Sequence, residues 1–199
     1  MAQNKIALKR RIRSVRATKK ITNAMELIAT SKLQRQKQKM ELNRVYANTL
    51  FQTFNRVLGS ANIQEIPYLT HREGKILTIV FVSDMGLCGG YNSNILSKIK
   101  ESIPNDQPLF IVGSKGRSWL RRQNYHLFGE LHIGDNLSYG HISKTADRIM
   151  DAYLSGEITG LQVLYTKFVN TMTFEPTIRT LLPITEEILP GVEENDDHL

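Results

Sequence analysis

The residues whose types could do chemistry gather in one short turn, Ser-Asp-Met-Gly-Leu-Cys-Gly-Gly-Tyr-Asn, at residues 83–92. A glycine-rich turn after a buried strand is where doubly wound folds bind phosphates. Here the pattern is Gly86-x-x-Gly89-Gly90, which is neither G-x-G-x-x-G nor the GK[ST] of a P-loop. We therefore interpret these glycines as residues that permit positive φ and close packing in a tight turn.

No catalytic or metal-binding set completes this turn. Cys88 is the only cysteine, so the chain cannot form an internal disulfide framework. The sequence places none of the five histidines beside Cys88, and we expect a small buried thiol rather than a nucleophile. No Cys or His pair has metal-ligand spacing, and Asp84 beside Ser83 fits turn chemistry better than acid catalysis. The sequence predicts no catalytic residue, no cofactor and no metal.

A mostly parallel sheet is expected to position the turn. Residues 75–82 form a continuous apolar run, rich in β-branched residues, that is typical of a strand buried on both faces. Further strands are predicted at 109–112, 161–168 and 174–181, the last an edge strand in which Pro176 is tolerated. Helices are predicted at 93–102, 117–122 and 141–154. Alternating strands and helices predict an α/β, Rossmann-like domain over roughly residues 70–185.

The segment before this domain reads as one long helix. From Lys5 to Leu58 there is neither glycine nor proline, the two residues that interrupt helices. A helix of about 55 residues would be about 80 Å long. A domain of this size cannot bury such a rod, so we expect residues 1–60 to project and pack on something else.

An apolar seam follows the rod in steps of three or four, with one step of six. This spacing is typical of a stripe that faces another helix. The seam consists of Leu8, Ile12, Val15, Ile21, Met25 and Ile28. After Leu33 the stripe gives way to a polar run that ends at Met40. We interpret the seam as helix packing, which leaves open what the helix packs against.

Charge separates the two ends of the chain. The formal net charge is +7, and residues 1–44 hold 13 of the 26 Lys and Arg but only Glu26 and Glu41 as acids. Residues 186–199 contain six acidic residues and no Lys or Arg, which predicts an acidic, disordered tail. A basic helix permits nucleic-acid binding. That remains the alternative, although no aromatic residues are interleaved with the basic stretch.

The sequence pattern excludes two kinds of membrane-related segment. The sequence has no run of 18 apolar residues, so it predicts no transmembrane helix. The N-terminus lacks the apolar core of a secretory signal.

Four ordered motifs resemble those of the gamma subunit of F-type ATP synthases. The first lies on the long helix, the second is the glycine-rich turn, and the others follow later strands. They are Ile21-Thr-x-Ala-Met25 with Ser31-Lys32-Leu33, Ser83-Asp84-x-Gly86-Leu87-Cys88-Gly89-Gly90-Tyr91-Asn92, Gly113-Ser-Lys-Gly116, and Phe168-Val-Asn-Thr-Met172 with Pro176-Thr177 and Leu181-Leu-Pro183. Together they extend over essentially the whole sequence.

The resemblance implies a rotor. In that family the N-terminal helix pairs with a C-terminal helix as an antiparallel coiled coil, and this shaft turns inside a ring of alpha and beta subunits. The Rossmann-like domain stands at its foot, on the epsilon subunit and the membrane ring of c subunits. The gamma subunit is non-catalytic and peripheral, on the cytoplasmic face of the bacterial inner membrane. By motif position, Met25, Lys32 and Arg35 are expected to be rotor–stator contacts.

Two features depart from the family pattern. Met85 stands where the family usually has arginine in the turn. The sequence ends at Leu199, whereas the family continues into the second shaft helix. A piece of a longer chain, a short non-rotary paralogue and one half of a split gene are all open explanations. We expect the rod, when it is alone, to fray, self-associate or borrow a partner helix.

Overall fold

The computed structural model describes residues 2–58, 67–132, 139–169 and 173–184. The chain divides into two units, Met1–Gly59 and Ser60–Leu199.

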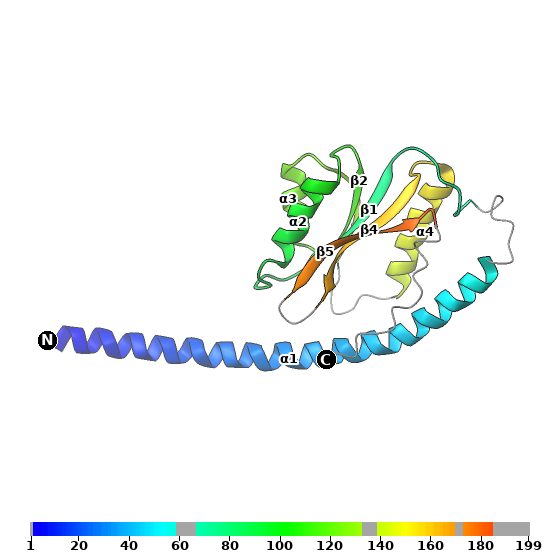
Figure 1. The fold of residues 1–199 in the computed structure, drawn as a ribbon. Coiled ribbons are helices and arrows are strands. Elements are labelled where there is room, and N and C mark those ends of the chain that lie inside the picture. Colours follow the sequence, from blue (N-terminus) through cyan, green and yellow to red (C-terminus); the bar gives the residue numbers. More distant parts are fainter. Residues whose placement is uncertain (1, 59–66, 133–138, 170–172, 185–199) are drawn as a thin grey trace. The chain divides into compact units, whose positions relative to one another are not determined.

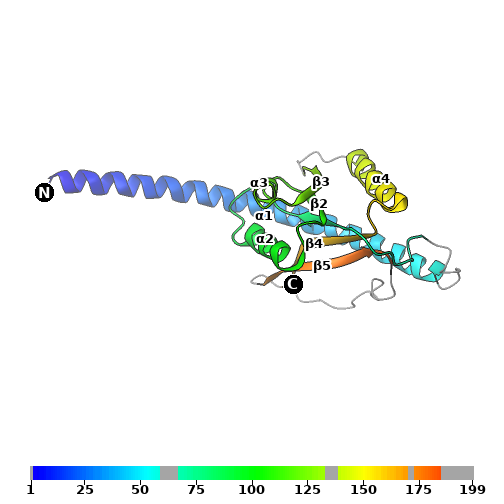
Figure 2. The same ribbon diagram turned by 90° about the horizontal axis from the view of Figure 1, so that it is seen from above.

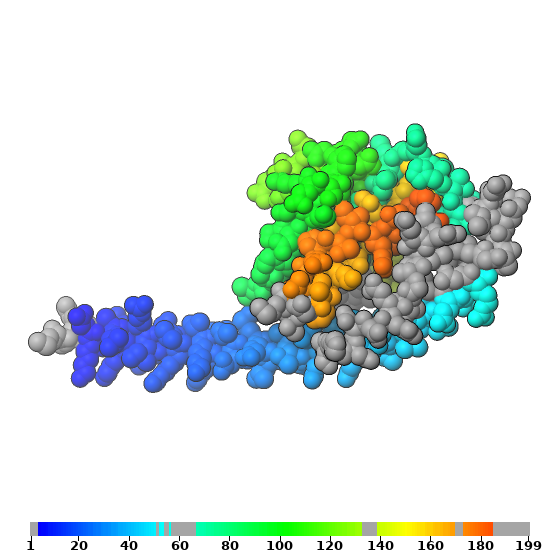
Figure 3. All heavy atoms as spheres, in the orientation of Figure 1, coloured from blue at the N-terminus to red at the C-terminus, as the bar shows by residue number. Residues whose placement is uncertain are grey.

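The first unit is a single helix, α1, that runs from Ala2 to Leu58 and confirms the predicted uninterrupted helix (Figure 1). Four of its threonines, Thr18, Thr22, Thr49 and Thr53, donate the hydroxyl to the carbonyl oxygen four residues earlier, as Thr18 does to Ser14 at 3.1 Å. Of the side chains described in α1, only Ala47 and Asn48 are half-buried and the others are exposed. In the space-filling view, side chains stand out along the length of α1 (Figure 3).

The second unit is built on a five-stranded sheet with the order β3-β2-β1-β4-β5. The strands are β1 (Ile76–Phe81), β2 (Pro108–Val112), β3 (His126–Leu131), β4 (Gly160–Phe168) and β5 (Phe174–Leu182). The β1–β2, β1–β4 and β2–β3 pairs are parallel, whereas β4 and β5 are antiparallel. The expected α/β unit with a mostly parallel sheet is thereby confirmed, as is the edge position of β5.

Helices cover both faces of this sheet and create two hydrophobic cores. On one face α4 (Tyr139–Ser155) packs its buried Ile149, Ala152 and Tyr153 against Leu77 of β1 and neighbouring strands. On the other face α2 (Tyr91–Ser102) and α3 (Arg117–Arg122) contribute a second set of buried side chains. These are Ile95, Ile99 and Leu120, packed with Val80, Leu109, Ile111 and Leu164. Figures 1 and 2 show α4 on the opposite side of the sheet from α2 and α3.

Strand β3 is the element that sequence patterns did not predict. Its sequence, His-Leu-Phe-Gly-Glu-Leu, contains a glycine and two polar residues and lacks the β-branched run seen in β1. The glycine has a packing reason, because a Cβ on Gly129 would lie 2.7 Å from the ring of Phe110 in β2. The register also shifts at this point of the β2–β3 pair. Tertiary contacts rather than local propensity make this segment a strand.

The edge strand β3 is contacted by a side chain from the helix layer. Arg148 of α4 donates to the carbonyl oxygen of Phe128 at 3.0 Å, and its guanidinium lies 4.8 Å from the centre of the Phe128 ring. At the opposite edge of the sheet, β5 contains Pro176 opposite Thr166 of β4.

Candidate functional site

The three residues predicted to touch a surrounding ring all lie on α1. Met25 is 49% exposed, and Lys32 and Arg35 are also exposed. At about 100° per residue, Lys32 and Arg35 stand one heptad beyond Met25 and Ile28 respectively. The apolar stripe of Met25 and Ile28 therefore continues into a cationic stripe on nearly the same side of the helix.

The six seam residues are all exposed, by between 43% and 61%. They lie on two adjacent faces rather than on one straight line, because a step of six rotates the stripe. Leu8, Ile12 and Val15 form the first face. Ile21, Met25 and Ile28 form the second, roughly a third of a turn further round the helix. A straight partner could not cover both faces, whereas a partner that winds around α1 could cover them in succession.

The first third of α1 also has a cationic face. Lys9, Arg13, Arg16 and Lys20 follow one another in steps of three or four and, with Ile12 and Ala17, line a shallow groove on the helix. Residues three and four apart are neighbours on a helix surface, so the four charges concentrate on one side. Such a face suits an acidic partner surface.

The glycine-rich turn after β1 is held by its own polar side chains. The Asn92 side chain accepts from the backbone N–H of Ser83 at 3.0 Å and donates to the Ser83 hydroxyl at 2.7 Å. The Ser83 hydroxyl in turn lies 2.6 Å from the carbonyl oxygen of Met85. Ser83 therefore links the start of the turn to Met85 and to the first turn of α2.

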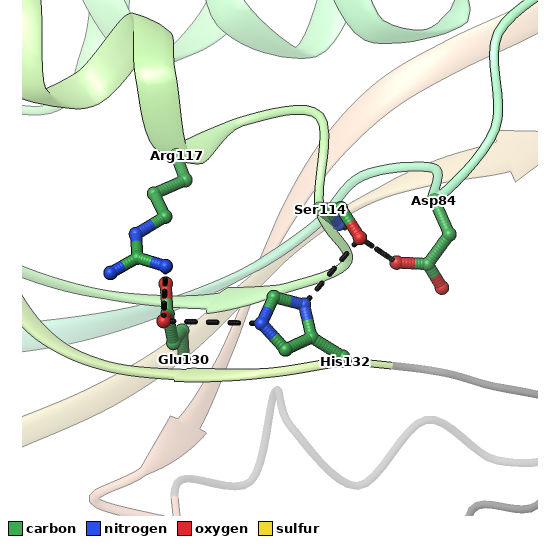
Figure 4. Close-up of polar contacts among 5 residues, drawn as sticks. All are labelled: Asp84, Ser114, Arg117, Glu130 and His132. Carbon is green, nitrogen blue, oxygen red and sulfur yellow. Dashed lines mark hydrogen bonds and ion pairs between the residues drawn. The ribbon is translucent and has the colours of Figure 1, made fainter.

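Asp84 has a different partner, the second glycine motif. Its Oδ1 accepts from the backbone N–H of Ser114 at 2.9 Å and from the Ser114 hydroxyl at 2.5 Å. Figure 4 shows these two residues facing each other from the loops after β1 and β2. The two motifs, distant in sequence, are thus joined at the carboxyl ends of adjacent parallel strands. Asp84 acts as a structural acceptor between two loops, rather than within its own turn.

The glycines of the turn divide into two kinds. Gly89 has φ of 55°, and Leu87, two residues earlier, has φ of 63°, so the backbone of this stretch adopts positive φ. Gly90 has φ of −79°, and a Cβ on Gly86 would meet nothing within 4 Å. The interpretation that all three glycines serve backbone freedom and close packing therefore holds for Gly89 and not for Gly86.

Cys88 is exposed, so the expectation of a small buried thiol is wrong. The turn directs the side chain outward, where its sulfur lies 3.2 Å from Nδ2 of Asn92 and 3.6 Å from the hydroxyl of Ser83. No histidine is among the contacts that the structure gives this thiol.

A cavity of about 350 Å³ opens beside this turn. Its lining comes from the start of α2 and from the ends of β4 and β5: Cys88, Gly89, Gly90, Tyr91, Asn94, Thr166 and Phe174. This is where the strand order reverses, the usual ligand position in doubly wound sheets. Burial raises the pKa of the Tyr91 phenol, which keeps this lining side chain neutral. Over the described ranges, no group of three or more His, Cys, Asp or Glu side chains could hold a metal ion.

A further polar cluster was missed by sequence reasoning. Arg117, Glu130 and His132 lie near Ser114 at the ends of β2 and β3 (Figure 4). Two of them, Glu130 and His132, lie in or just after β3, a strand that the sequence patterns did not predict. Once β3 is known, the alternation of Glu130 and His132 at a strand end is the signal that would place them together.

None of the helices within the described residues combines the length and the apolar character needed to cross a lipid bilayer.

Comparison with known proteins gives consistent matches. A family model described as ATP synthase matches residues 4–198. The ATP synthase gamma chain of Clostridium novyi is 36% identical over 187 residues, which is 92% of this chain and 66% of that protein. The gamma chain of Legionella pneumophila (strain Corby) is 33% identical over 196 residues, 94% of this chain and 66% of that protein. The chain thus spans about two thirds of the length of the curated relatives it matches.

Among solved structures, the central stalk and c-ring of Tetrahymena thermophila mitochondrial ATP synthase contains a chain with a TM-score of 0.48 and 21% identity. That match covers 68% of this chain and 70% of the other.

Proposed function

The chain belongs to the ATP synthase family, and we propose that it is the central-stalk rotor subunit of an F-type ATP synthase. In this role it couples ion-driven rotation of a membrane ring to ATP synthesis or hydrolysis at the catalytic beta subunits. One observation carries the proposal: gamma-chain similarity covers nearly the whole sequence, α1 included, and α1 exposes its apolar seam. The subunit itself is non-catalytic and needs no cofactor.

The seam supports a coiled-coil shaft. Apolar residues in steps of three and four are the contacts of one helix with another, and six of them are exposed on α1. The rotation between the two seam faces fits a partner helix that winds around α1. In the proposal this partner is an antiparallel helix, supplied by further sequence of the same protein or by a separate chain.

The charged residues of α1 support contacts with the surrounding ring. Met25, Lys32 and Arg35 are the proposed rotor–stator contacts with the alpha and beta subunits. The groove residues Lys9, Arg13, Arg16 and Lys20 are suited to acidic loops on the same subunits. A charged contact that is made and broken during a turn shapes the barrier to rotation more than the affinity of the complex.

The α/β unit supports the foot of the stalk. We propose a shaft segment at residues 1–60 and a Rossmann-like domain at 70–185. The predicted acidic tail at 186–199 lies outside the described residues. The domain is proposed to contact the epsilon subunit and the ring of c subunits, on the cytoplasmic face of the bacterial inner membrane. The subunit is proposed to attach there peripherally, through these protein contacts.

Reconstitution tests the proposal. The chain is mixed with cognate alpha and beta subunits, with and without a peptide that carries the C-terminal third of a matched gamma chain. Size exclusion and ATPase assays follow. We expect co-elution and stimulated ATPase activity in at least the mixture with the peptide. Elution apart from alpha and beta in both mixtures would contradict the rotor assignment.

A matched pair of variants tests the contact face. Arg35→Ala removes a cation from the predicted contact face, whereas Lys37→Ala removes one about 200° round the helix. We expect Arg35→Ala to change the stimulated ATPase rate about two- to fivefold, the range of an exposed charge contact. Lys37→Ala should leave the rate unchanged. Equal effects would place the contact elsewhere.

The cationic face of α1 is compatible with one alternative function, nucleic-acid binding. Binding to DNA or RNA with a steep salt dependence, together with failure to join alpha and beta, would favour it. A short non-rotary paralogue would instead join the ring without stimulating ATPase activity.

A further inference from the structure

The cavity of about 350 Å³ beside the glycine-rich turn lies between the start of α2 and the hairpin of β4 and β5. Figures 1 and 2 show α2 beside β5. One wall belongs to the turn and to α2, and the other is made by Thr166 and Phe174 of the hairpin. All of the lining residues lie in the α/β unit, so the cavity is a property of that unit alone.

The cavity is the outer end of the hydrophobic core between α2 and the sheet. Leu164 of β4 and Ile178 of β5 pack in that core. Side chains an even number of residues apart on a strand point to the same face, so Thr166 continues the row of Leu164. Phe174 continues the row of Ile178 in the same way. Both hairpin residues therefore face the α2 layer, just beyond the filled part of the core.

Helix α2 fills this core only along its later turns. Ile95 and Ile99 are completely buried against the sheet. At the beginning of the helix, Gly89 and Gly90 place no side chain against the hairpin. A Cβ on Gly89 would meet nothing within 4 Å, so space is left beside it. The open volume therefore follows from the two consecutive glycines.

The cavity also lies where open α/β sheets bind ligands. In the order β3-β2-β1-β4-β5, the chain builds outward from β1 to one side and then crosses to β4 on the other. The segment after β1 supplies one wall of the cavity and the last residues of β4 supply part of the other. Ligands bind at such a switch point, outside the carboxyl ends of the strands. A volume of about 350 Å³ is within the range of ordinary ligand pockets.

The lining disfavours charged ligands. Among the described residues that line the cavity, none is Asp, Glu, His, Lys or Arg. Burial raises the pKa of the Tyr91 phenol, so its hydroxyl stays neutral and can both donate and accept. A phosphate or a carboxylate would lose hydration here without meeting a counter-charge. An uncharged ligand does not carry this cost.

Phe174 gives the cavity an aromatic wall. The residue is 51% exposed, and its ring packs edge-to-face on Phe168, with centroids 5.7 Å apart and planes at 61°. This contact holds the ring while about half of the residue's surface stays uncovered. Aromatic rings attract further rings in stacked or edge-to-face arrangements. On the opposite wall, the Asn94 amide offers both donors and an acceptor.

We propose that this cavity binds a small, uncharged, planar aromatic molecule that carries at least one hydrogen-bonding group. The ring of the ligand packs on Phe174, and its polar group reaches the Asn94 amide or the Tyr91 hydroxyl. Such a ligand touches both the glycine-rich turn and the hairpin, so it stabilises the folded α/β unit by preferential binding. The inference goes beyond the rotor role and does not depend on it.

Protection of Cys88 from alkylation tests the site in the full chain. Cys88 is the single cysteine, is exposed and lines the cavity, so its reaction with iodoacetamide reports occupancy. The probe is indole, an uncharged planar ring system with one N–H. With half-saturation at about 1 mM, the affinity expected of so small a ligand, about 5 mM indole should slow alkylation about sixfold. The slowing should saturate as the indole concentration rises.

A charged analogue tests the class of ligand. Indole-3-acetate has the same ring system and adds a carboxylate. At the same concentration it should leave the alkylation rate of Cys88 unchanged, because the lining offers no counter-charge. Slowing as large as that caused by indole would overturn the assignment to uncharged ligands.

Asn94→Phe and Ser97→Phe form a matched pair of variants on α2. Both residues are exposed, so both variants are expected to fold. Asn94→Phe places a ring in the cavity and should abolish protection by indole, whereas Ser97 lies outside the lining and Ser97→Phe should retain it. Each rate is compared with that of the same variant without indole. The proposal is overturned if indole does not slow alkylation of the wild type, if the slowing does not saturate, or if Asn94→Phe is protected as strongly as the wild type.

Discussion

The two units of the chain use the same apolar residue types in opposite ways. In α1, Leu8 is 60% exposed and Ile12 is 43% exposed, although both belong to a regular seam. In the α/β unit, Leu77 and Ile95 are completely buried within cores on the two faces of the sheet. Each fully buried aliphatic side chain contributes about 1.5–3 kcal/mol. The α/β unit therefore carries its stabilising contacts within itself, whereas α1 leaves the apolar residues of its seam exposed.

The largest expected contrast comes from the same substitution in each unit. Leu77→Ala removes a fully buried side chain near the start of β1 and should lower the free energy of unfolding by about 2–5 kcal/mol. Leu8→Ala removes an exposed side chain and should change it by less than about 0.5 kcal/mol. Urea unfolding followed by the fluorescence of Trp119, the single tryptophan, measures both. Similar losses for the two variants would show that α1 already has a partner in the isolated chain.

Within the α/β unit, replacing a turn glycine by alanine should have very different effects on stability at two positions. A Cβ on Gly113 would lie 2.0 Å from the carbonyl oxygen of Val82, and the residue has φ of 108°. Gly113→Ala should therefore cost about 1–3 kcal/mol of stability, because the strand end must shift and the backbone is strained. Gly86→Ala is the control, since its Cβ would meet nothing within 4 Å. An equal cost at Gly86 would mean that its loop makes close contacts in solution.

A substitution that weakens α1 tests whether the two units unfold independently. Ala24→Gly lies in the exposed middle of α1 and should cost about 1 kcal/mol of helix stability. Circular dichroism should show less helix, while the Trp119 unfolding midpoint stays where it is. Movement of that midpoint would show that the two units unfold together.

The smallest expected effect concerns alkaline pH. Burial raises the pKa of Tyr91 above its ordinary value of 10.0, so the folded state disfavours the phenolate. The sign follows from linkage: the contribution to stability is present below pH 10 and is lost as the pH rises through the folded value. The unfolding midpoint should therefore fall as the pH rises above 10.0, and Tyr91→Phe should reduce that fall. Tyr139→Phe, in a side chain 83% exposed, is the control.

Local sequence patterns predicted a helix or strand correctly where a single residue property determines that element. The absence of glycine and proline predicted α1, and apolar runs predicted β1, β2 and β4, because these strands are buried by helices on both faces. Local patterns failed at β3, where packing of Gly129 against Phe110 and a register shift define the strand. They failed again at Cys88, because composition says a thiol is usually buried while this turn points it outward. The His132 cluster depends on β3 and could not be seen without it.

The two edges of the sheet have a consequence for how copies of the domain meet in a crowded solution. An open strand edge is a template for cross-strand pairing between molecules, and thus for aggregation. Here the β3 edge has the cationic side chain of Arg148 bonded to the Phe128 carbonyl, and the β5 edge includes Pro176, which has no N–H to offer. Both borders are thereby blunted against edge-to-edge assembly. For a chain that already exposes an apolar seam on α1, sheet edges that do not invite strand pairing remove a second route to aggregation.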